Sequence, residues 1–600
     1  MLLLLVSTRY FAVVDLDTRS WSLLFRAAML VAHFATVAAV SLLPMLALIL
    51  LWPHPRVALP LGVLSGAAIV TAALIDTQIY QLYRFHINAG VMNLLLGGAA
   101  GETFFFSAQV YAQFALIVAA ILGAFGIIGA CWWRYVNSRP RHPAVSRGIA
   151  AVLVAALVGF HSIHIWADAV GYEPFTEQTE ILPMRYAATA KRLLRTHGFN
   201  PKKAQFAQVR NDQTRGGLSY PLRPLTCRAP EYLPNVVVIL IDSWRFDELN
   251  AHVTPNMETF ARRATRFTDH YSGGNATRIG VFSLFYSIPG TYWHRMLAQR
   301  QGPVLIERLS KLSYDMQVFR SAPLYSPEFD RTVFAQIRPI RTFSEGTSPA
   351  ARDRDLTSDF IRYLDARSSA APFFALLFYD APHSFDHPKH YPATFQPAAS
   401  HVNYLRLRQD TDPRPLRNLY RNSLHYVDSL VGEALSALEQ RGLLEESVVI
   451  VTGDHGQEFN DSGQNFWGHS SNFTRFQTGV PFVLYAPDLA PGVHQHRTTH
   501  FDVVPTLMRD FLGCNEPFAT YSVGTSLFEP GGRETIVMSE YADFAILHAG
   551  QTAIVRKQGM EMRDANHMKL DDPLDPNAIE AALEQKTRFA GGVAHTYAFE

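Results

Sequence analysis

Residues Asn235-Val-Val-Val-Ile-Leu-Ile-Asp242 decide the fold of this chain of 600 residues. Their apolar, mostly β-branched run is typical of a parallel strand that is buried on both faces. A second such run, Ser447-Val-Val-Ile-Val-Thr452, leads into Gly453-Asp454-His455-Gly456. Open α/β sheets bind their ligands at the carboxyl ends of parallel strands. We therefore expect residues 232–548 to form an α/β domain with a central mixed sheet, helices on both faces and a functional site at the strand ends.

The side chains that follow these two strands are candidates for a metal site. Asp454 and His455 are neighbours on a turn whose glycines let the backbone come close to a ligand. With Asp242 they supply three ligands, which suit one divalent cation: Mg²⁺ or Mn²⁺, with Zn²⁺ as a further candidate. The alternative is that Asp454 and His455 form only a hydrogen-bonded pair on their turn.

A glycine-rich turn between the two strands, Ser272-Gly-Gly-Asn-Ala-Thr-Arg-Ile-Gly280, precedes an apolar run that reads as a helix. Such turns present free backbone N–H groups to anions. A hydroxyl at this position that also touches a cation can attack phosphorus. Thr277 is the candidate nucleophile and a fourth metal ligand. The alternative is that Thr277 or Asn275 is only a helix N-cap.

The N-terminal part, residues 1–170, is apolar and is expected to be a transmembrane domain, because a helix needs about 20 apolar residues to cross a bilayer. Charged residues are scarce before position 170 and frequent after it. The segment 85–107 is interrupted by glycines and is expected to be a loop or half-helix. Met1–Val6 is too short to span and is interpreted as the stub of a truncated first helix. The four expected spans are roughly 22–51, 57–80, 109–133 and 148–167.

Arginines predict the orientation of these spans. The loop 134–147 holds Arg134, Arg139, Arg141 and Arg147 and no acidic residue, so it is expected to be cytoplasmic. Counting spans outward from this loop puts residues 168 onward on the far side of the membrane. The soluble domain is therefore expected to be exported.

Residues 171–231 form a basic juxtamembrane linker, in which ten cations between Arg185 and Arg228 face one acid, Asp212. Pro183 and Gly198 predict the start and end of a short helix within it. Arginine binds phosphate through its planar fork, so the linker is a candidate site for an anionic membrane lipid. The alternative is a solvated basic linker. The candidate lipid-binding residues are Arg215, Tyr220, Arg223 and Arg228.

Composition adds two expectations. The net charge is only +1, and no nucleic-acid partner is expected. The three cysteines, Cys131, Cys227 and Cys514, give no disulfide framework and no metal-binding pair. Whether Cys227 and Cys514 pair stays open.

Residues 549–600 are expected to be a C-terminal appendage.

Three of these motifs resemble those of the sulfatase/alkaline-phosphatase superfamily: Asp242-Ser-Trp-Arg-Phe-Asp247, the turn from Gly274 to Gly280, and Gly453-Asp-His-Gly456. Gln457-Glu-Phe-Asn460 and Phe466-Trp-Gly-His469-Ser-Ser-Asn-Phe473 are similar to one branch, the YejM (PbgA) family of Gram-negative inner-membrane proteins. That family has five spans, which agrees with the interpretation of a truncated first helix.

The resemblance implies an α-helical transmembrane domain followed by a sulfatase/alkaline-phosphatase-like domain in the periplasm. It also implies Asp242, Asp454 and His455 as metal ligands and Thr277 as nucleophile and ligand. His383, in Asp380-Ala-Pro-His383, and His469 would contact the phosphoryl group or the leaving oxygen. Alignment with related lipoteichoic-acid synthases leaves open whether Ala276 or Thr277 occupies the nucleophile position.

Two functions remain open. One is a hydrolase or transferase of phosphate esters that works through a phospho-threonine. The other is a non-catalytic, lipid-binding regulator with a vestigial hydrolase domain. A true sulfatase is excluded, because no Cys/Ser-x-Pro-x-Arg sequence is present to form formylglycine. The resemblance further implies lipid A or phospholipid as partner, a membrane adaptor protein as a second partner, and a role in lipopolysaccharide homeostasis.

Overall fold

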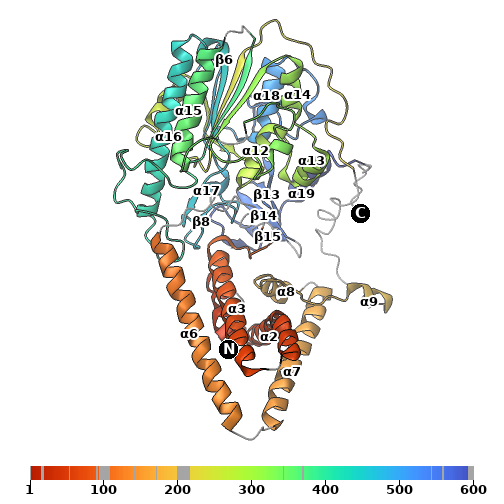
Figure 1. Cartoon of the computed structure of the whole chain (residues 1–600). Coiled ribbons are helices and arrows are strands. Elements are labelled where there is room, and N and C mark those ends of the chain that lie inside the picture. Colours follow the sequence, from red (N-terminus) through yellow and green to blue (C-terminus); the bar gives the residue numbers. More distant parts are fainter. Residues whose placement is uncertain are drawn as a thin grey trace. The chain divides into compact units, whose positions relative to one another are not determined.

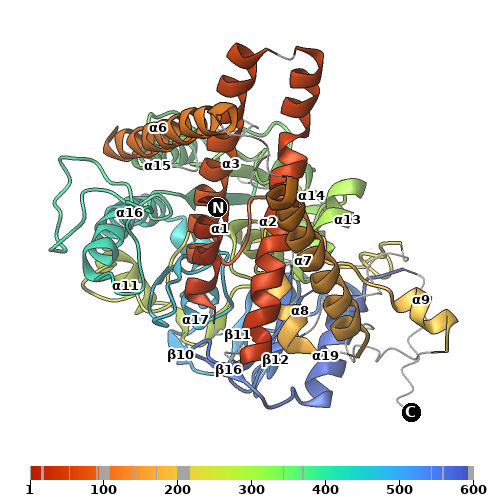
Figure 2. The same ribbon diagram turned by 90° about the horizontal axis from the view of Figure 1, so that it is seen from below.

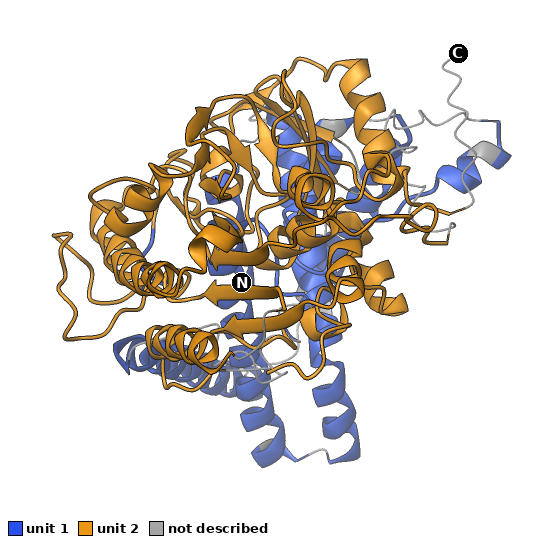
Figure 3. Ribbon diagram, turned by 90° about the horizontal axis from the view of Figure 1, so that it is seen from above, with its two compact units in different colours: residues 1–92, 106–205, 403–407 blue, residues 93–105, 206–402, 408–600 orange. Residues whose placement is uncertain are grey.

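The computed structural model describes residues 2–591, except 15–18, 53, 89–91, 93–107, 139–142, 171, 199–216, 342–343, 368–370, 542 and 557–559. The chain divides into two compact units (Figure 3). Unit 1 comprises residues 1–92, 106–205 and 403–407, and unit 2 comprises residues 93–105, 206–402 and 408–600. Each unit is described by itself below.

Unit 1 is helical, and four long helices lie within a few residues of the four expected spans (Figure 2). Four of its helices are long and apolar enough to cross a membrane: α2 (Ser20–Leu51), α3 (Pro55–Tyr83), α6 (Ala108–Ser138) and α7 (Pro143–Val170). Helix α2 packs beside α7, and α3 packs beside α6. The short elements are α1 (Leu2–Ser7), η1 (Thr8–Val13), α8 (Glu173–Glu180) and α9 (Lys191–Thr196). Most of the segment 85–107 lies outside the described residues.

The helix expected from Pro183 to Gly198 is shorter than its sequence signals indicate. Residues 185–190 form no regular secondary structure, and α9 begins only at Lys191. The segment before α9 binds the helices of unit 1 instead of forming its own hydrogen bonds. His33 contacts the carbonyl of Pro183 at 2.8 Å, and Nδ1 of His164 contacts the carbonyl of Ala188 at 2.8 Å. These contacts replace the backbone bonds that a longer helix would make.

Unit 2 is built on a seven-stranded mixed sheet, which confirms the expected fold class (Figure 1). Strand β1 lies between β6 and β5 and is parallel to both, and β4 is parallel to β5. Strand β9 is antiparallel to β6 and to β2. In spatial order the strands are β10 (Gly492–His494), β2 (Thr265–Phe267), β9 (Phe482–Tyr485), β6 (Ser447–Gly453), β1 (Asn235–Ile241), β5 (Phe373–Tyr379) and β4 (Asp315–Arg320).

Helices cover this sheet because β1, β5 and β6 are buried along their whole length and leave no solvated face. The apolar sides of α12 and α14 share one core with alternate residues of β1, among them Val236, Val238 and Leu240. Helices α15 and α16 lie side by side (Figure 1). The helices of unit 2 are α11 (Pro255–Ala261), α12 (Thr277–Tyr286), α13 (Trp293–Gln299), α14 (Val304–Lys311), α15 (Pro349–Ala366), α16 (Arg414–Gln440), α17 (Arg475–Thr478), α18 (Val503–Thr506) and α19 (Pro576–Thr587).

A second, antiparallel sheet follows near the C-terminal end, and α19 packs against it. Strands β13 and β14 pair with each other, with His548 opposite Gln551. The domain boundary expected at residue 548 therefore falls inside this sheet. Its strands are β12 (Thr535–Ser539), β13 (Phe544–His548), β14 (Gln551–Val555), β15 (Met560–Arg563) and β16 (Lys569–Leu570). Two-residue pairs complete the strands: β3 (His270–Tyr271) with β11 (Thr498–Thr499), and β7 (Glu458–Phe459) with β8 (Trp467–Gly468).

The question left open about the cysteines is answered within unit 2. Cys227 and Cys514 form a disulfide that joins residues 287 positions apart in the chain. It fastens the end of the basic linker to the loop before residue 517, where the amide of Arg228 also donates to the carbonyl of Gly513 at 3.1 Å.

Candidate functional site

The three expected metal ligands meet at the carboxyl ends of two neighbouring strands. Strands β1 and β6 pair in register, with Ile241 opposite Gly453, so Asp242 and Asp454 both follow the last paired residues. Nε2 of His455 lies 3.6 Å from a carboxylate oxygen of Asp242 and 3.6 Å from one of Asp454. All three side chains are buried, and their ligand atoms lie within 4.8 Å of one another.

Hydrogen bonds hold the carboxylates of Asp242 and Asp454 in place, but one oxygen of Asp454 accepts none from the described residues. The backbone amides of Ser243 and His455 donate to Oδ1 of Asp454 at 3.0 and 2.8 Å, and the Ser243 hydroxyl donates to Asp242 at 2.9 Å. Oδ2 of Asp454 has no hydrogen-bond partner within the described part of the chain. A buried carboxylate oxygen without a donor is unfavourable, unless a cation occupies the space in front of it. The residues present therefore fit one divalent cation.

Thr277 reaches the same cluster from helix α12. Its hydroxyl lies 3.4 Å from Oδ2 of Asp242 and 3.2 Å from Nε2 of His455. The N-cap residue is Ala276, which is extended and makes no side-chain cap bond, so neither Asn275 nor Thr277 serves as the N-cap. Asn275 instead donates to the carbonyl of Asn472 at 2.8 Å. Of the two candidate positions for the nucleophile, Thr277 has the hydroxyl, and this hydroxyl touches the cluster.

The two histidines expected at the phosphoryl group lie next to the ligands. The ring of His469 is 4.3 Å from that of His455 and 5.1 Å from that of His383, and Nδ1 of His469 contacts Gln457 at 3.1 Å. Nδ1 of His383 lies 3.6 Å from Asp380.

Asp380 is a member of the site that sequence reasoning missed. It follows β5, the other neighbour of β1, and with Asp242 and His383 it forms a second group whose ligand atoms lie within 4.8 Å. The signal was present in the sequence, because Asp380 ends an apolar strand in the same way as Asp242 does.

Burial of several carboxylates in one place changes their protonation. Burial raises the pKa of Asp454 to about 7 and that of Asp380 to about 7. Burial, together with the charge of Asp454, also raises the pKa of Asp242. For His383 burial acts downward, but Asp242 and Asp380 outweigh it and the pKa is raised. Burial and the two neighbouring imidazoles hold the pKa of His469 well below its usual value. The site thus holds two different imidazoles: that of His383 is readily protonated, and that of His469 stays neutral.

Known families and proteins resemble this chain over most of its length. Residues 1–227 match a family described as "Domain of unknown function (DUF3413)", and residues 234–511 match the Sulfatase family. The chain is 26% identical over 561 residues to the inner membrane protein YejM of Salmonella typhimurium, which covers 92% of this chain and 89% of that protein. The chain is thus similar to YejM over most of its length, and its residues 234–511 are similar to the Sulfatase family.

Two further proteins are similar to this chain. An uncharacterized protein of Haemophilus influenzae is 26% identical to the YejM-like chain over 580 residues, covering 96% of this chain and 91% of that protein. The crystal structure of a protein in the alkaline phosphatase superfamily from Vibrio parahaemolyticus aligns with a TM-score of 0.46 at 16% identity, covering 64% of this chain and 96% of that one.

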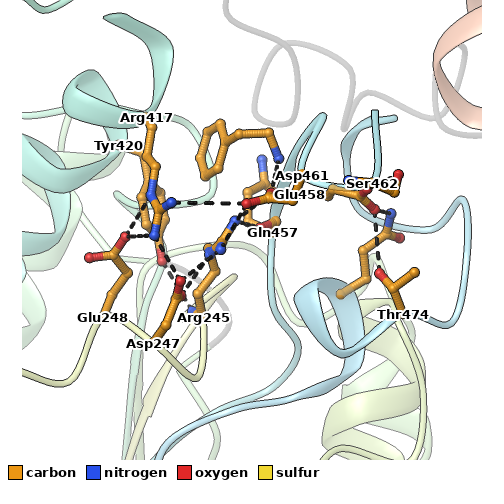
Figure 4. Close-up of polar contacts among 12 residues, drawn as sticks. Arg245, Asp247, Glu248, Arg417, Tyr420, Gln457, Glu458, Asp461, Ser462 and Thr474 are labelled. Atoms are coloured by element: carbon orange, nitrogen blue, oxygen red, sulfur yellow. Dashed lines mark hydrogen bonds and ion pairs between the residues drawn. The ribbon is translucent and has the colours of Figure 1, made fainter. Parts of the chain in front are cut away.

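A network of charged side chains connects the loop after Asp242 with the loop after His455 (Figure 4). The fully buried guanidinium of Arg245, three residues after Asp242, donates to Asp247 at 2.8 Å and to Asp461 at 2.7 Å. Asp461 belongs to the loop that follows Asp454 and His455. Arg245 therefore ties together the two loops that carry the ligands. Arg417 of α16 extends the network to Asp247 and Glu248, at 2.8 and 2.7 Å.

The expected lipid-binding residues are only partly available at the surface. Tyr220 is buried, its hydroxyl donates to the carbonyl of Tyr286 at 3.0 Å, and its ring packs against Phe589. Its assignment as a lipid contact is therefore wrong, since the ring belongs to the core of unit 2. Arg223 is exposed and pairs with Glu516 at 3.0 Å, and Arg228 is exposed. Arg215 lies outside the described residues.

Proposed function

We propose that the YejM-like chain is a metal-dependent phosphoesterase or phosphotransferase that acts on a phosphate ester of an anionic membrane lipid. One observation carries the catalytic part of this proposal. The Thr277 hydroxyl stands at the start of α12, within 3.4 Å of a carboxylate and 3.2 Å of an imidazole that belong to a buried ligand cluster. A threonine that served only to cap a helix would not require contacts to a carboxylate and an imidazole.

The chemistry follows from what each side chain can do. A divalent cation held by Asp242, Asp454 and His455 would polarise the phosphoryl oxygen and lower the pKa of the hydroxyl. Oγ1 of Thr277 attacks phosphorus while its proton passes to Asp242. The bond from phosphorus to the ester oxygen breaks, and His383 gives its proton to the leaving oxygen. Water or an acceptor hydroxyl then attacks phosphorus and gives its proton to His383, while the bond from phosphorus to Thr277 breaks and Oγ1 recovers its proton from Asp242. The N-terminus of α12 favours the negative charge of the phosphate.

The proposed location is the bacterial inner membrane, with several spans and the sulfatase-family domain in the periplasm. Four apolar helices of sufficient length and relatives named as inner membrane proteins support it. The arginines of the loop 134–147 favour a cytoplasmic position for that loop, which puts unit 2 on the opposite side.

The proposed partners are an anionic lipid, either lipid A or phospholipid, and a membrane adaptor protein. The excess of arginine and lysine between residues 185 and 228 supports the proposal that the chain binds an anionic lipid. Each cation near an anionic surface contributes roughly 1 kcal/mol. Some of this charge is already paired: Arg185 lies 3.7 Å from Glu180, and Lys191 lies 2.8 Å from Asp168. Arg223 also pairs with Glu516 at 3.0 Å but is exposed, and Arg215, Arg223 and Arg228 stay the candidates for lipid contact. A role in lipopolysaccharide homeostasis is part of the proposal.

Turnover tests the catalytic part. The detergent-purified protein with Mn²⁺ should hydrolyse p-nitrophenyl phosphate, Thr277→Ala should lose at least about 10³-fold in kcat, and Thr277→Ser should keep part of the activity. The matched control is Thr259→Ala, at an exposed position of α11. Normal turnover by Thr277→Ala refutes the assigned nucleophile. A wild type that binds lipid but turns over no phosphate or lipid ester favours the non-catalytic regulator.

A further inference from the structure

The C-terminal sheet contacts the glycine-rich turn that precedes Thr277. Where β12 ends, the amide of Ser539 donates to the carbonyl of Gly273 at 2.9 Å, and Ser539 pairs with Gly274 as an isolated bridge. The next residue, Glu540, accepts from Asn275 at 3.4 Å. The chain after β12 therefore runs alongside the turn that leads into Thr277, and it brings Tyr541 to the start of α12.

Tyr541 is one of two aromatic rings that hold Arg278, the residue after Thr277. The guanidinium lies 4.8 Å from the ring centre of Tyr541 and 5.1 Å from that of Trp293. Trp293 is buried, whereas Tyr541 is 53% exposed, so this arrangement opens to solvent on one side. Two rings on one guanidinium restrict its motion and leave its edge, with the N–H donors, for polar partners.

The donors of Arg278 are incompletely used. One terminal nitrogen pairs with Glu328 at 3.3 Å, while Nε is buried and has no hydrogen-bond partner in the part of the chain that the structure describes. A buried guanidinium N–H without an acceptor is unfavourable, so an anion next to Thr277 that accepted this bond would stabilise the arrangement. Glu328 also lies 3.8 Å from Arg331, so it keeps a cation if Arg278 turns to another anion.

We propose that Arg278 is a substrate-binding residue that donates to an anionic oxygen of the phosphate ester, with Tyr541 and Trp293 holding its guanidinium in place. This inference rests on the proposed function, because it places the phosphate at Thr277. Arginine suits the task, since its fork matches two oxygens of a phosphate. Glu328 acts as the counter-ion of Arg278 until an anion arrives, and the exposed ring of Tyr541 covers the guanidinium from the solvent side.

Binding of inorganic phosphate tests this without requiring turnover. Calorimetry on the Mn²⁺-loaded, detergent-purified full chain should give a phosphate Kd that is about 10- to 100-fold weaker in Arg278→Met, the loss of one charge-assisted hydrogen bond or a bidentate pair. Arg278→Lys should fall between the two. Glu328→Gln should bind phosphate several-fold tighter, because the competing carboxylate is gone. A structural ion pair does not predict this gain.

The matched control is Arg475→Met. Arg475 also lies 4.3 Å from an aromatic ring, that of Phe246, and pairs with Asp269 at 3.4 Å. Its Nε, like that of Arg278, is buried without a partner among the described residues, but Arg475 does not adjoin Thr277. Its phosphate Kd should stay within twofold of the wild type. Phosphate affinity that is absent in the wild type, or unchanged in both Arg278→Met and Glu328→Gln, overturns the inference. If phosphate binding responds as expected but no variant turns over ester, only the catalytic proposal fails.

Discussion

Substitution of Gly280 by alanine adds one methyl group, which should push α12, and Thr277 with it, away from Asp454. A Cβ atom built there would lie 2.0 Å from the backbone oxygen of Asp454 and 2.7 Å from its carbonyl carbon. Both are backbone atoms, so no side-chain rotation can relieve the clash. Restoring a contact of at least 3.0 Å requires α12 and the turn of Asp454 to move apart by about 1 Å.

Two effects of Gly280→Ala on stability oppose each other. Overpacking typically costs ~1–3 kcal/mol. Alanine in a helix interior returns ~1 kcal/mol relative to glycine. The free energy of unfolding should therefore fall by only ~0–2 kcal/mol. Misplacing a catalytic group by about 1 Å, by contrast, can cost ~10²-fold in rate. Thr277 lies one helical turn before Gly280, so its hydroxyl moves with the helix.

The assay compares p-nitrophenyl phosphate turnover, Mn²⁺ content and the melting temperature of the full chain. Gly280→Ala should lose about 10²-fold in kcat while it remains folded. Gly492→Ala is the control, because a Cβ atom there meets no atom within 4 Å. Helix propensity alone predicts the opposite result. A Gly280→Ala protein that is more stable and fully active would refute the close approach of α12 to Asp454.

Other expectations concern the metal, the lipid and the topology. Asp454→Ala and His455→Ala should each lose the one divalent cation that elemental analysis finds in the wild type, and a wild type without metal contradicts the site. Arg215→Glu combined with Arg223→Glu should weaken lipid A binding strongly at physiological salt and leave Mn²⁺ content unchanged; equal affinity would make the linker a solvated segment. A periplasmic reporter fused after residue 300 should be active, and activity of a cytoplasmic reporter alone would reverse the orientation.

Local sequence patterns were sufficient to predict that Asp242, Asp454 and His455 cluster, but not to predict the residues around them. Asp242, Asp454 and His455 each follow an apolar run, and this pattern can be recognised without knowing the strand order. The role of Asp380 depends on β5 being the neighbour of β1, although the two strands are more than a hundred residues apart. Strand order is a property of long-range packing, and a single strand does not encode it.

The misassignment of Tyr220 has the same cause. An apolar stretch beside Arg223 in a basic linker indicates a contact with lipid, but the partners of Tyr220 are Tyr286 and Phe589, which are distant in the sequence. Tyr541 reaches Arg278 for a similar reason, since the C-terminal sheet delivers it to the start of α12. Burial that is created by distant segments leaves no local periodicity to recognise.

The buried carboxylates make a last prediction about the affinity of the site for metal. Burial raises the pKa of Asp454 and of Asp380 to about 7, so near neutral pH each carboxyl holds a proton for part of the time. A cation must displace these protons to bind Asp454, and Asp380 contributes its charge only when it is ionised. Affinity for Mn²⁺ should therefore rise with pH, by up to about tenfold per pH unit for each proton released, and level off above about pH 8.

Calorimetry in buffers of different ionisation enthalpy measures both the Mn²⁺ affinity and the number of protons released. Asp380→Asn should reduce the pH dependence without abolishing binding, because Asp242, Asp454 and His455 remain. If the site instead held its carboxylates ionised in the absence of metal, affinity would be flat between pH 6 and 8 and no proton would be released on binding. That result would mean that polar contacts within the domain already compensate the charge of these carboxylates, and that the partnerless oxygen of Asp454 is not the feature that draws a cation to the site.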